Sequence, residues 1–400
     1  MIALFEDQKW RKLYPLSLSH PVWELRVGIF RIFEKYEKLT GKPALFTRKY
    51  LEEVVRENFP DYQVNDYGIR DVVLVNSRVI PDSQFVELIN SLKTGEAITK
   101  NGEILACRVE SVDGFFDDEG VFSGCKALNE REMGSVKTFT YLYELVHANS
   151  GEIVNDSRYF EEGVRGKVFD GVHILGHVVI EEGATVYPGV VLDGLEGPIV
   201  IDRDAVIMPN ATVIGPVYIG RKSRIKVGAK IYEGTSIGPV CKVGGEVEES
   251  VIQGFSNKQH DGFLGHAYLG EWVNLGADTN NSDLKNNYSS VKIFIDGEWV
   301  NTGEMFVGLM MGDHSKSGIN TMFNTGTVVG FSSNVYGGDF PPKFIPSFAW
   351  GGSGGFVTYR LDKAIETARR VMARRKVDLR DAYRKMMEEI FRLTERERNF

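Results

Sequence analysis

A repeat with a period of six residues runs through the middle of the sequence. A period of six fits neither the 3.6-residue period of an amphipathic helix nor the alternation of a hairpin strand. It is typical of a solenoid in which short strands and tight corners alternate, and in which each rung is stabilised by its neighbours. Eight aliphatic residues carry the repeat without a break: Ile201, Ile207, Val213, Ile219, Ile225, Ile231, Ile237 and Val243. Small or short residues follow the first seven at the fourth position: Ala205, Ala211, Val217, Ser223, Ala229, Thr235 and Cys241.

The repeat begins before this run and continues after it. Its phase slips at "LDGLEGPIV", again after Val243, and once more between Ala277 and Val307. Each slip predicts a loop that leaves the coil, and such loops tend to form the binding face of a repeat protein. The earlier aliphatic positions are Val168, Ile174, Ile180 and Val186, and the later ones are Val307, Ile319 and Phe331. Corner glycines, where a positive φ is expected, are Gly183, Gly189, Gly228 and Gly234.

Two regions of different character flank the repeat. In residues 1–155 the strand candidates "IALF", "PALFT" and "DVVLVN" alternate with the helical stretches "RKYLEEVVREN" and "SQFVELINSLK", which predicts an α/β domain. Residues 156–355 form the predicted β-helix. In residues 356–400 an apolar stripe predicts an amphipathic helix that packs on its own chain or on a neighbouring copy, with a partner-binding helix as the alternative. The stripe consists of Leu379, Tyr383, Met386, Ile390 and Leu393.

Composition narrows the class of protein. The formal charge of −8 and a pI near 5.6 argue against a nucleic-acid partner, because such proteins cluster Lys and Arg. The start of the sequence lacks the pattern of a secretory signal, and no apolar run is long enough to cross a membrane, so we expect a cytoplasmic protein with no membrane partner. Cys107, Cys125 and Cys241 are too few and too far apart to predict a disulfide framework or a zinc site.

Two of the seven histidines lie six residues apart in "NKQHDGFLGHAYLGEWVNLGA" (257–277), in step with the apolar repeat. Aliphatic positions at 257, 263 and 269 would place His260 and His266 at the fourth position, which points outward. An outward imidazole is not needed for packing, although a surface histidine without a catalytic role remains the alternative for His260. We expect His266 to line a neighbouring face or a subunit contact, and we predict no metal site, because no third ligand has a regular spacing to either histidine.

The coil of hexapeptides resembles the left-handed parallel β-helix of hexapeptide-repeat acyltransferases. The stretch around His260 is similar to the acetyltransferase domain of the bifunctional family that acetylates glucosamine 1-phosphate and then joins the product to a uridyl group. This resemblance implies that His260 is the general base and that Asn274 contacts the sugar. It also implies that Ala277 offers backbone groups to acetyl-CoA, and that Phe263 replaces a sugar-contacting tyrosine. An imidazole suits a general base because its pKa lies near neutral pH. The matching residues are His260, Phe263, Leu264, Gly265, Asn274, Gly276 and Ala277.

Further substrate contacts are implied by the same resemblance. Asn287 and Tyr288 are similar to an Asn-Tyr pair of the family, and Lys292 to a lysine that contacts phosphate. Asn280, Asn281 and Lys285 remain alternatives for these roles, and Glu248 stands where the family has a basic residue. A second polar cluster in "MGDHSKSGIN" (311–320) contains Lys316, which we interpret as a contact to a CoA phosphate. A solvated corner is the alternative interpretation of that cluster.

The N-terminal segments "RKLYPLSLSHPVWELRVG" (11–28) and "DVVLVNSRVIPD" (71–82) resemble sugar-1-phosphate nucleotidyltransferases. The loop "FEDQKWR" (5–11) has no glycine to cradle phosphates, Val22 replaces a lysine, and Ser77 and Arg78 replace Gly-Asp. The carboxylate that would hold Mg²⁺ is therefore missing, and Mg²⁺ stays open as a cofactor. We expect Arg11, Arg26 and Arg78 to bind the phosphate of a sugar phosphate or nucleotide sugar through guanidinium forks, with Lys12 and His20 nearby.

The complete arrangement is similar to a form of this bifunctional family that has a short N-terminal domain. The resemblance implies a homotrimeric transferase of amino-sugar nucleotide biosynthesis, which acetylates a sugar-phosphate amine on the β-helix and whose N-terminal activity is open. One alternative is a nucleotidyltransferase whose β-helix only assembles the oligomer. The other is a non-catalytic protein that binds a nucleotide sugar. The sequence does not fix the acceptor sugar, the nucleotide base or the role of the C-terminal helix.

Overall fold

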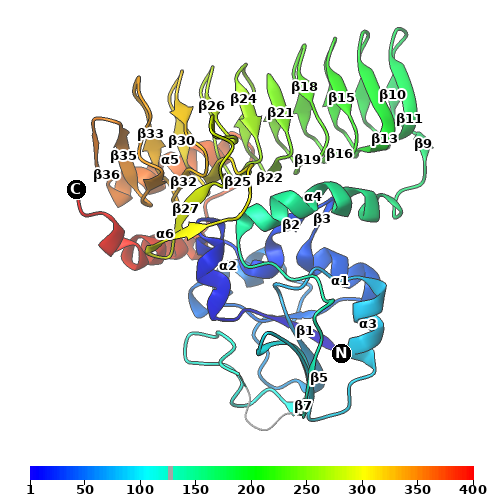
Figure 1. Cartoon of the computed structure of the whole chain (residues 1–400), viewed down its shortest axis with the longest axis vertical. Helices are drawn as coiled ribbons and strands as arrows, with labels where there is room; N and C mark the ends of the chain where they lie inside the picture. The colour runs from blue at the N-terminus through cyan, green and yellow to red at the C-terminus, as the bar shows by residue number, and fades with distance from the viewer. Residues whose placement is uncertain (125–128) are drawn as a thin grey trace.

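The computed structural model describes residues 1–124 and 129–400, and Cys125 lies outside them. It consists of an N-terminal α/β domain, a parallel β-helix and two C-terminal helices (Figure 1), which confirms the predicted fold class. Helix α4 (Leu142–Ser157) runs between the α/β domain and the coil. Among the described residues, no helix combines the length and the apolar character that crossing a membrane requires.

The N-terminal domain is built on a six-stranded sheet in the order β4-β1-β5-β7-β6-β8. Strands β4, β1 and β5 are parallel, and β7 runs antiparallel to β5. Alternate residues of β1 and β5 belong to two separate apolar clusters, so both faces of the sheet are covered. The strands are β1 (Ile2–Phe5), β4 (Ala44–Leu45), β5 (Arg70–Asn76), β6 (Glu96–Lys100), β7 (Glu103–Ser111) and β8 (Asn129–Glu132). The other elements are η1 (Gln8–Leu13), η2 (Leu16–Leu18), η3 (Val22–Glu24), β2 (Arg26–Val27), β3 (Phe30–Arg31), α1 (Ile32–Thr40), α2 (Lys49–Asn58) and α3 (Ser83–Asn90).

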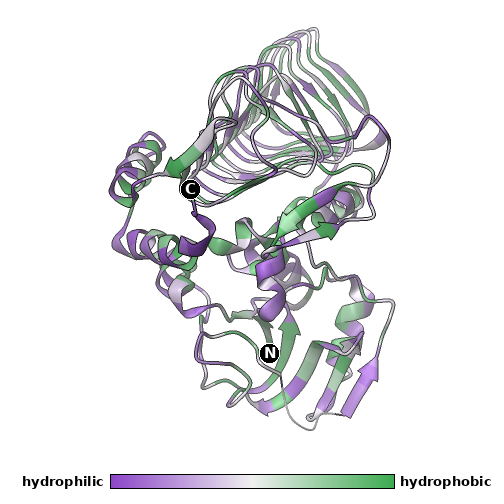
Figure 2. Ribbon diagram, turned by 60° about the vertical axis from the view of Figure 1, so that its left-hand side comes forward, coloured by the Kyte–Doolittle hydropathy of each residue, from purple (hydrophilic) through white to green (hydrophobic). Residues whose placement is uncertain are grey.

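The β-helix has three faces, and Figure 2 shows its stacked rungs. The eight predicted aliphatic residues are at most 1% exposed and share one core. The first face contains six strands followed by three more, and Asn274 bridges the two groups. Because Asn274 occupies a rung of its own, this face has ten rungs. These nine strands are β10 (Lys167–Val168), β12 (Thr185–Val186), β14 (Val206–Ile207), β17 (Arg224–Ile225), β20 (Lys242–Val243), β23 (Asn257–Lys258), β30 (Lys316–Ser317), β33 (Asn334–Val335) and β35 (Ala349–Gly352).

The remaining strands form the other two faces and the ends of the coil. The long strands β11 (His173–Ile180) and β13 (Val191–Ile201) contribute to both faces. The second face continues through β15 (Thr212–Ile214), β18 (Lys230–Ile231), β21 (Glu246–Glu248), β24 (Phe263–Gly265), β26 (Asn280–Asn281) and β31 (Met322–Phe323). The third face continues through β9 (Gly163–Val164), β16 (Val217–Ile219), β19 (Thr235–Ile237), β22 (Val251–Gly254), β25 (Tyr268–Glu271), β29 (Met310–Met311), β32 (Val328–Val329) and β34 (Phe344–Ile345). Strand β36 (Gly355–Thr358) pairs antiparallel with β35 at the end of the coil.

The register of the repeat differs from the prediction after Val243. Val243 pairs with Lys258, fifteen residues on, and Leu264 rather than Phe263 is the buried residue of β24. The predicted aliphatic positions 257 and 263 are therefore wrong by one residue, because a shortened turn follows Val243. Ile319, predicted to rejoin the ladder, is 69% exposed at a corner.

Of the three predicted loops, only the third leaves the coil, and it returns to the N-terminal domain. Strand β13 runs unbroken through the first slip, and the second is the shortened turn after Val243. The segment between Ala277 and Val307 contains the hairpin of β27 (Lys292–Ile295) and β28 (Glu298–Asn301). Lys12 Nζ lies 2.5 Å from a carboxylate oxygen of Glu298, so the hairpin contacts the segment that follows β1. The third loop therefore joins the two domains.

The C-terminal segment forms two helices, α5 (Leu361–Ala373) and α6 (Asp381–Leu393), rather than one. Met386 and Ile390 of α6 are buried in the same cluster as the N-terminal core. Lys385 of α6 pairs with Glu53 of α2 at 2.9 Å. The predicted apolar stripe therefore packs on its own chain.

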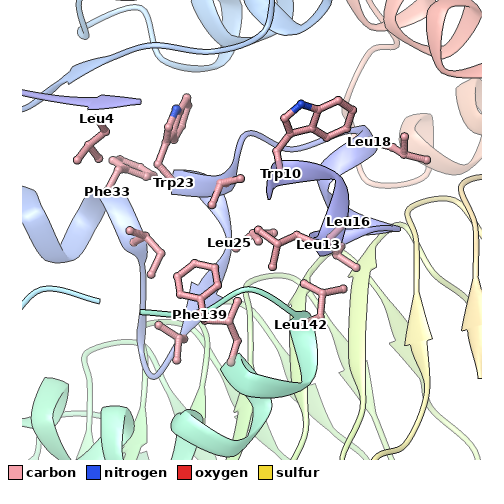
Figure 3. Packing of buried hydrophobic residues seen from close by; sticks show 14 of the residues in the cluster. Leu4, Trp10, Leu13, Leu16, Leu18, Trp23, Leu25, Phe33, Phe139 and Leu142 are labelled. Atoms are coloured by element: carbon pink, nitrogen blue, oxygen red, sulfur yellow. The ribbon is translucent and has the colours of Figure 1, made fainter. Parts of the chain in front are cut away.

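The third face of the β-helix is fixed against the N-terminal domain. The Tyr268 hydroxyl accepts the backbone N–H of Arg26 at 2.8 Å and donates to its carbonyl at 2.9 Å. Asn149 of α4 accepts from the Gly28 N–H and donates to the Gly234 carbonyl, both at 2.7 Å. Gly28 has a φ of +73° and an added Cβ would lie 2.7 Å from the backbone of α4, so only glycine fits there. Figure 3 shows part of the apolar cluster of the N-terminal domain, including Leu13, Leu16, Leu25 and Leu142.

Candidate functional site

His260 lies at a corner of the prism, between the first and second faces. Its side chain is exposed, as expected for an imidazole that packing does not need. The backbone N–H of Asp278 donates to the Asp261 carbonyl at 3.1 Å, and that of Asn320 donates to the Ala277 carbonyl at 2.8 Å. The corners that hold His260, Ala277 and Asn320 are therefore stacked on consecutive rungs along one edge.

A lysine that the sequence analysis did not single out supports this corner. Lys258 occupies the inward position opposite Val243 and is 2% exposed. Its Nζ donates to the His260 carbonyl at 2.6 Å, and burial lowers its pKa to about 8. Lys258 therefore fixes the backbone that carries His260. A charged residue in an otherwise aliphatic ladder is the signal that would have revealed it.

The predicted substrate contacts beyond His260 fall into two groups. Phe263 is half-buried on the second face, and its N–H donates to Asn280 Oδ1 at 2.8 Å. Asn281 exchanges two hydrogen bonds with the backbone of Gly265, at 3.0 and 2.9 Å. The structure thus places the alternatives Asn280 and Asn281 beside the His260 stretch.

Asn287 and Tyr288 lie farther along the chain, in the loop that leads into the β27–β28 hairpin, and Lys292 is the first residue of β27. All three are exposed. Asn287 Oδ1 accepts hydrogen bonds from the N–H and the hydroxyl of Ser289, so this amide is used within its own loop. The resemblance assigned them to the substrate, whereas Asn280 and Asn281 are the amides placed on the coil face.

Asn274 and Lys316 line one cavity. They are neighbours on the first face, where the Asn274 N–H donates to Ser315 O at 3.1 Å and the Ser317 N–H donates to Asn274 O at 3.0 Å. Lys316 Nζ donates to His314 O at 2.6 Å, and burial lowers the pKa of Lys316 to about 8. The lysine is half-buried, so the alternative of a fully solvated corner does not describe it.

A second edge, beside α4, holds Glu248, His266 and Asp283. One ligand atom from each lies within 4.8 Å of the others, and this is the only such group of three among the described residues. His266 Nδ1 lies 2.9 Å from Asp283 Oδ2, which orients the imidazole with or without an ion. The prediction that no third metal ligand is regularly spaced from His266 is wrong. Glu248 and Asp283 lie 18 and 17 residues from His266, about one turn of the coil.

Arg78 lies where β1 and β5 end, at the carboxyl edge of the N-terminal sheet. Its side chain is 2% exposed. Its guanidinium donates to both oxygens of Asp7, to Glu103 at 2.6 Å and to the Phe139 carbonyl at 3.0 Å. Lys9 pairs with the same Glu103. Every nitrogen of the Arg78 guanidinium is thus engaged within the protein, which leaves no free fork for the predicted phosphate contact.

The other two predicted arginines lie in different surroundings. Arg26 is 5% exposed at the contact with the β-helix, where its Nη1 donates to the Ile29 carbonyl. Arg11 is exposed, stacks on Trp10 at 4.9 Å, and lines a separate cavity of 460 Å³. The structure therefore does not gather Arg11, Arg26 and Arg78 around one phosphate.

The carboxylates of the N-terminal sheet edge do not fit a Mg²⁺ site. Asp7 and Glu103 are the acidic residues that meet there, and both are neutralised by Arg78, with Lys9 also on Glu103. Mg²⁺ requires free carboxylate oxygens and several waters. The side chains at this edge therefore do not support a metal-dependent step in this domain.

A buried charge cluster at the domain contact provides a pH-dependent test. His20 lies 2.8 Å from Asp313 and 3.1 Å from Glu24. Burial, with the charges of Asp313 and Glu24, raises the pKa of the nearby Glu271 to about 7, although His20 and Arg31 lower it. A glutamate that keeps its proton only in the folded state stabilises that state at low pH.

We expect stability to fall between about pH 5 and 7, because the unfolded Glu271 releases its proton near its ordinary pKa of 4.5 while the folded one retains it. Glu271→Gln removes this contribution. Urea unfolding from pH 5 to 8 should show a steeper loss of unfolding free energy in the natural protein than in the variant. Glu249 and Glu397, whose pKa values burial also raises to about 7, remain in both proteins and act as the internal control. Parallel pH profiles would contradict the assignment to Glu271.

Comparison with known proteins confirms the resemblance drawn from the sequence. Residues 2–165 match the family described as sugar nucleotidyl transferase. A bifunctional sugar-1-phosphate nucleotidylyltransferase/acetyltransferase of Sulfurisphaera tokodaii is 32% identical over 183 residues, which cover 46% of this chain. The alignment spans only 41% of that relative's length. A bifunctional protein GlmU of Methanococcus aeolicus is 28% identical over 383 residues, covering 81% of this chain and 90% of the relative.

Among solved structures, a UDP-N-acetylglucosamine acyltransferase of Francisella novicida aligns with 56% of this chain and 90% of its own. Its TM-score is 0.37 and its sequence identity is 11%.

Proposed function

We propose a role in amino-sugar nucleotide biosynthesis for this chain. It is similar to a bifunctional protein GlmU over 81% of its length, and its residues 2–165 match the family described as sugar nucleotidyl transferase. The proposed reaction is acetyl transfer from acetyl-CoA to the amine of a sugar phosphate similar to glucosamine 1-phosphate. The reaction would take place on the β-helix edge that carries His260. Acetyl-CoA is a substrate here rather than a resident cofactor.

The observation that carries this proposal is the position of His260. Its imidazole is exposed at a corner whose backbone is fixed by Lys258 and whose next rung presents Ala277. In the proposed reaction the sugar amine attacks the thioester carbonyl and His260 accepts the amine proton. The tetrahedral intermediate then collapses, the C–S bond breaks, and the CoA thiolate takes up the proton. Asn274 contacts the sugar phosphate in this proposal, and Ala277 contacts acetyl-CoA.

We further propose that the active protein is a homotrimer with this edge between chains. Three large apolar residues lie at corners of the same edge: Val227 is 58% exposed, Ile319 69% and Tyr336 49%. Ile319 and Tyr336 lie at the corners of neighbouring rungs, and adjoining exposed apolar side chains are typical of a protein contact. Sedimentation of the protein at micromolar concentration should give three times the chain mass, and a monomer would contradict the shared site.

A thiol-release assay tests the proposed activity. Purified protein, acetyl-CoA and glucosamine 1-phosphate should release free CoA thiol, and a screen of other amino-sugar phosphates would identify the acceptor. Absence of release with every amino-sugar phosphate would reject acetyl transfer.

Nucleotidyl transfer by the N-terminal domain is the second candidate, favoured by the family match over residues 2–165. The closed network of Arg78, Asp7 and Glu103 argues against a metal-dependent reaction there. Release of pyrophosphate from UTP and a sugar 1-phosphate tests for nucleotidyl transfer. Running the assay with and without Mg²⁺ shows whether that reaction needs a metal. Binding of a nucleotide sugar without turnover in either assay would favour a non-catalytic protein.

A further inference from the structure

A cavity of 330 Å³ lies between α5 and the first face of the β-helix. Four cationic side chains line it: Lys242 and Lys316 from the coil, and Arg374 and Arg375 from the residues just after α5. Sequence reasoning placed only Lys316 near a ligand. The two arginines reach the cavity only because the chain folds back along the coil after residue 358.

None of the four cations has an anionic partner among the residues that the structure describes. None of them forms an ion pair in the two described stretches, 1–124 and 129–400. Lys316 donates to the carbonyl of His314, and Arg375 Nη2 donates to the amide oxygen of Asn257 at 2.8 Å, and both of these acceptors are neutral.

These cations also repel one another. Burial lowers the pKa of Lys242, and the charges of Arg375, Arg224 and Arg374 lower it further. Burial likewise lowers the pKa of Arg375, and the charges of Arg374 and Arg224 lower it further, although Cys241 raises it. Burial and mutual repulsion of the cations cost electrostatic free energy, which a bound anion would offset.

The rest of the lining fits a phosphorylated ligand. Amides provide neutral hydrogen-bond donors beside the cations, and the stacked rings of Phe255 and Trp272, 4.5 Å apart, form an apolar wall. Arginine forks and lysine ammonium groups are the usual partners of phosphate oxygens. Asn257, Gln259 and Asn274 are the lining amides. Gln259 directly precedes His260, so the cavity borders the proposed catalytic corner.

We infer that Lys242, Lys316, Arg374 and Arg375 form an anion pocket that binds a phosphate group of a substrate, with the end of α5 as part of the binding site. The identity of that substrate rests on the proposed function, because the phosphate belongs either to CoA or to the acceptor sugar. The presence of an anion site does not rest on it.

Calorimetric titration of the full-length protein tests the pocket with three probes: pyrophosphate, CoA and glucosamine 1-phosphate. Pyrophosphate binding needs no turnover, so it remains informative if acetyl transfer fails. We expect Arg375→Ala and Lys242→Ala each to weaken pyrophosphate binding about tenfold or more. Arg375→Lys should recover part of the loss because it keeps the charge without the fork.

Arg370→Ala is the matched control, because this exposed arginine of α5 pairs with Glu366 and is not part of the cavity lining. If the pocket variants also lose affinity for CoA but not for glucosamine 1-phosphate, the phosphate belongs to CoA. If they lose affinity for glucosamine 1-phosphate but not for CoA, it belongs to the sugar. Unchanged affinity for all three probes in a folded Lys242→Ala variant, with an unchanged melting temperature, would overturn the proposal.

Discussion

Replacing His260 by alanine should lower the rate of acetyl transfer by about 100-fold or more, the range found for positioned general bases. The expected loss lies in kcat and kcat/KM together, because the imidazole accepts its proton in the transition state. The side chain is exposed and its corner is held through the backbone by Lys258. We therefore expect the variant to fold as the natural protein does. Thiol release at saturating acetyl-CoA measures the effect.

His173→Ala is the matched control for this variant. His173 is also exposed on the β-helix, in β11 near the far end of the coil. It should retain full activity. If His260→Ala kept the natural rate, the proton acceptor would have to be another group. His266, oriented by Asp283 at 2.9 Å, would then be the next residue to replace.

Replacing Arg78 by methionine should lower the free energy of unfolding by about 3 kcal/mol, as when one partner of a buried ion pair is removed. Methionine roughly preserves the volume but leaves Asp7 without its strongest partner and Glu103 with Lys9 alone. The Phe139 carbonyl also loses its donor. Urea unfolding followed by circular dichroism measures the change.

Arg108→Met controls for the loss of an arginine in the same sheet. Arg108 pairs with Asp71 near the surface, and exposed ion pairs contribute little to the free energy of unfolding. If Arg78→Met instead left the stability unchanged and abolished binding of a nucleotide sugar, Arg78 would be the phosphate contact that its position in the sequence suggested. Its engagement by Asp7 and Glu103 would then have to open when the ligand binds.

Local patterns were sufficient to predict most of the fold. The ladder from Ile201 to Val243 repeats because each rung is buried against the rungs next to it, so a regular spacing in the sequence maps directly onto the coil. The predicted strands "IALF" and "DVVLVN" correspond to β1 and β5, and their short apolar runs between helical stretches were sufficient to indicate an α/β domain. The break in the repeat after Val243 is visible in the sequence, but the spacing did not show that the turn leading to Lys258 is shortened to fifteen residues.

The candidate sites depended on contacts between distant segments, and there the sequence was less informative. Arg375 meets Asn257 across 118 positions, and no spacing rule predicts such a contact. The sequence predicts that Arg78 binds phosphate, whereas in the structure its guanidinium pairs with Asp7. Glu248 and Asp283 could have been matched to His266 by the length of one coil turn. The repeat pattern alone does not distinguish the corner of His260 from the other corners of the coil. The resemblance to an acetyltransferase motif is what singled it out.

The most direct measurement is a crystal structure of the protein with CoA bound. The proposed function predicts that the CoA sulfur lies within hydrogen-bonding reach of the His260 imidazole and beside Ala277, on the edge that faces a neighbouring chain. A complex in which the CoA sulfur lies at another edge of the prism, or on the N-terminal domain, with His260 in contact with solvent alone, would contradict it.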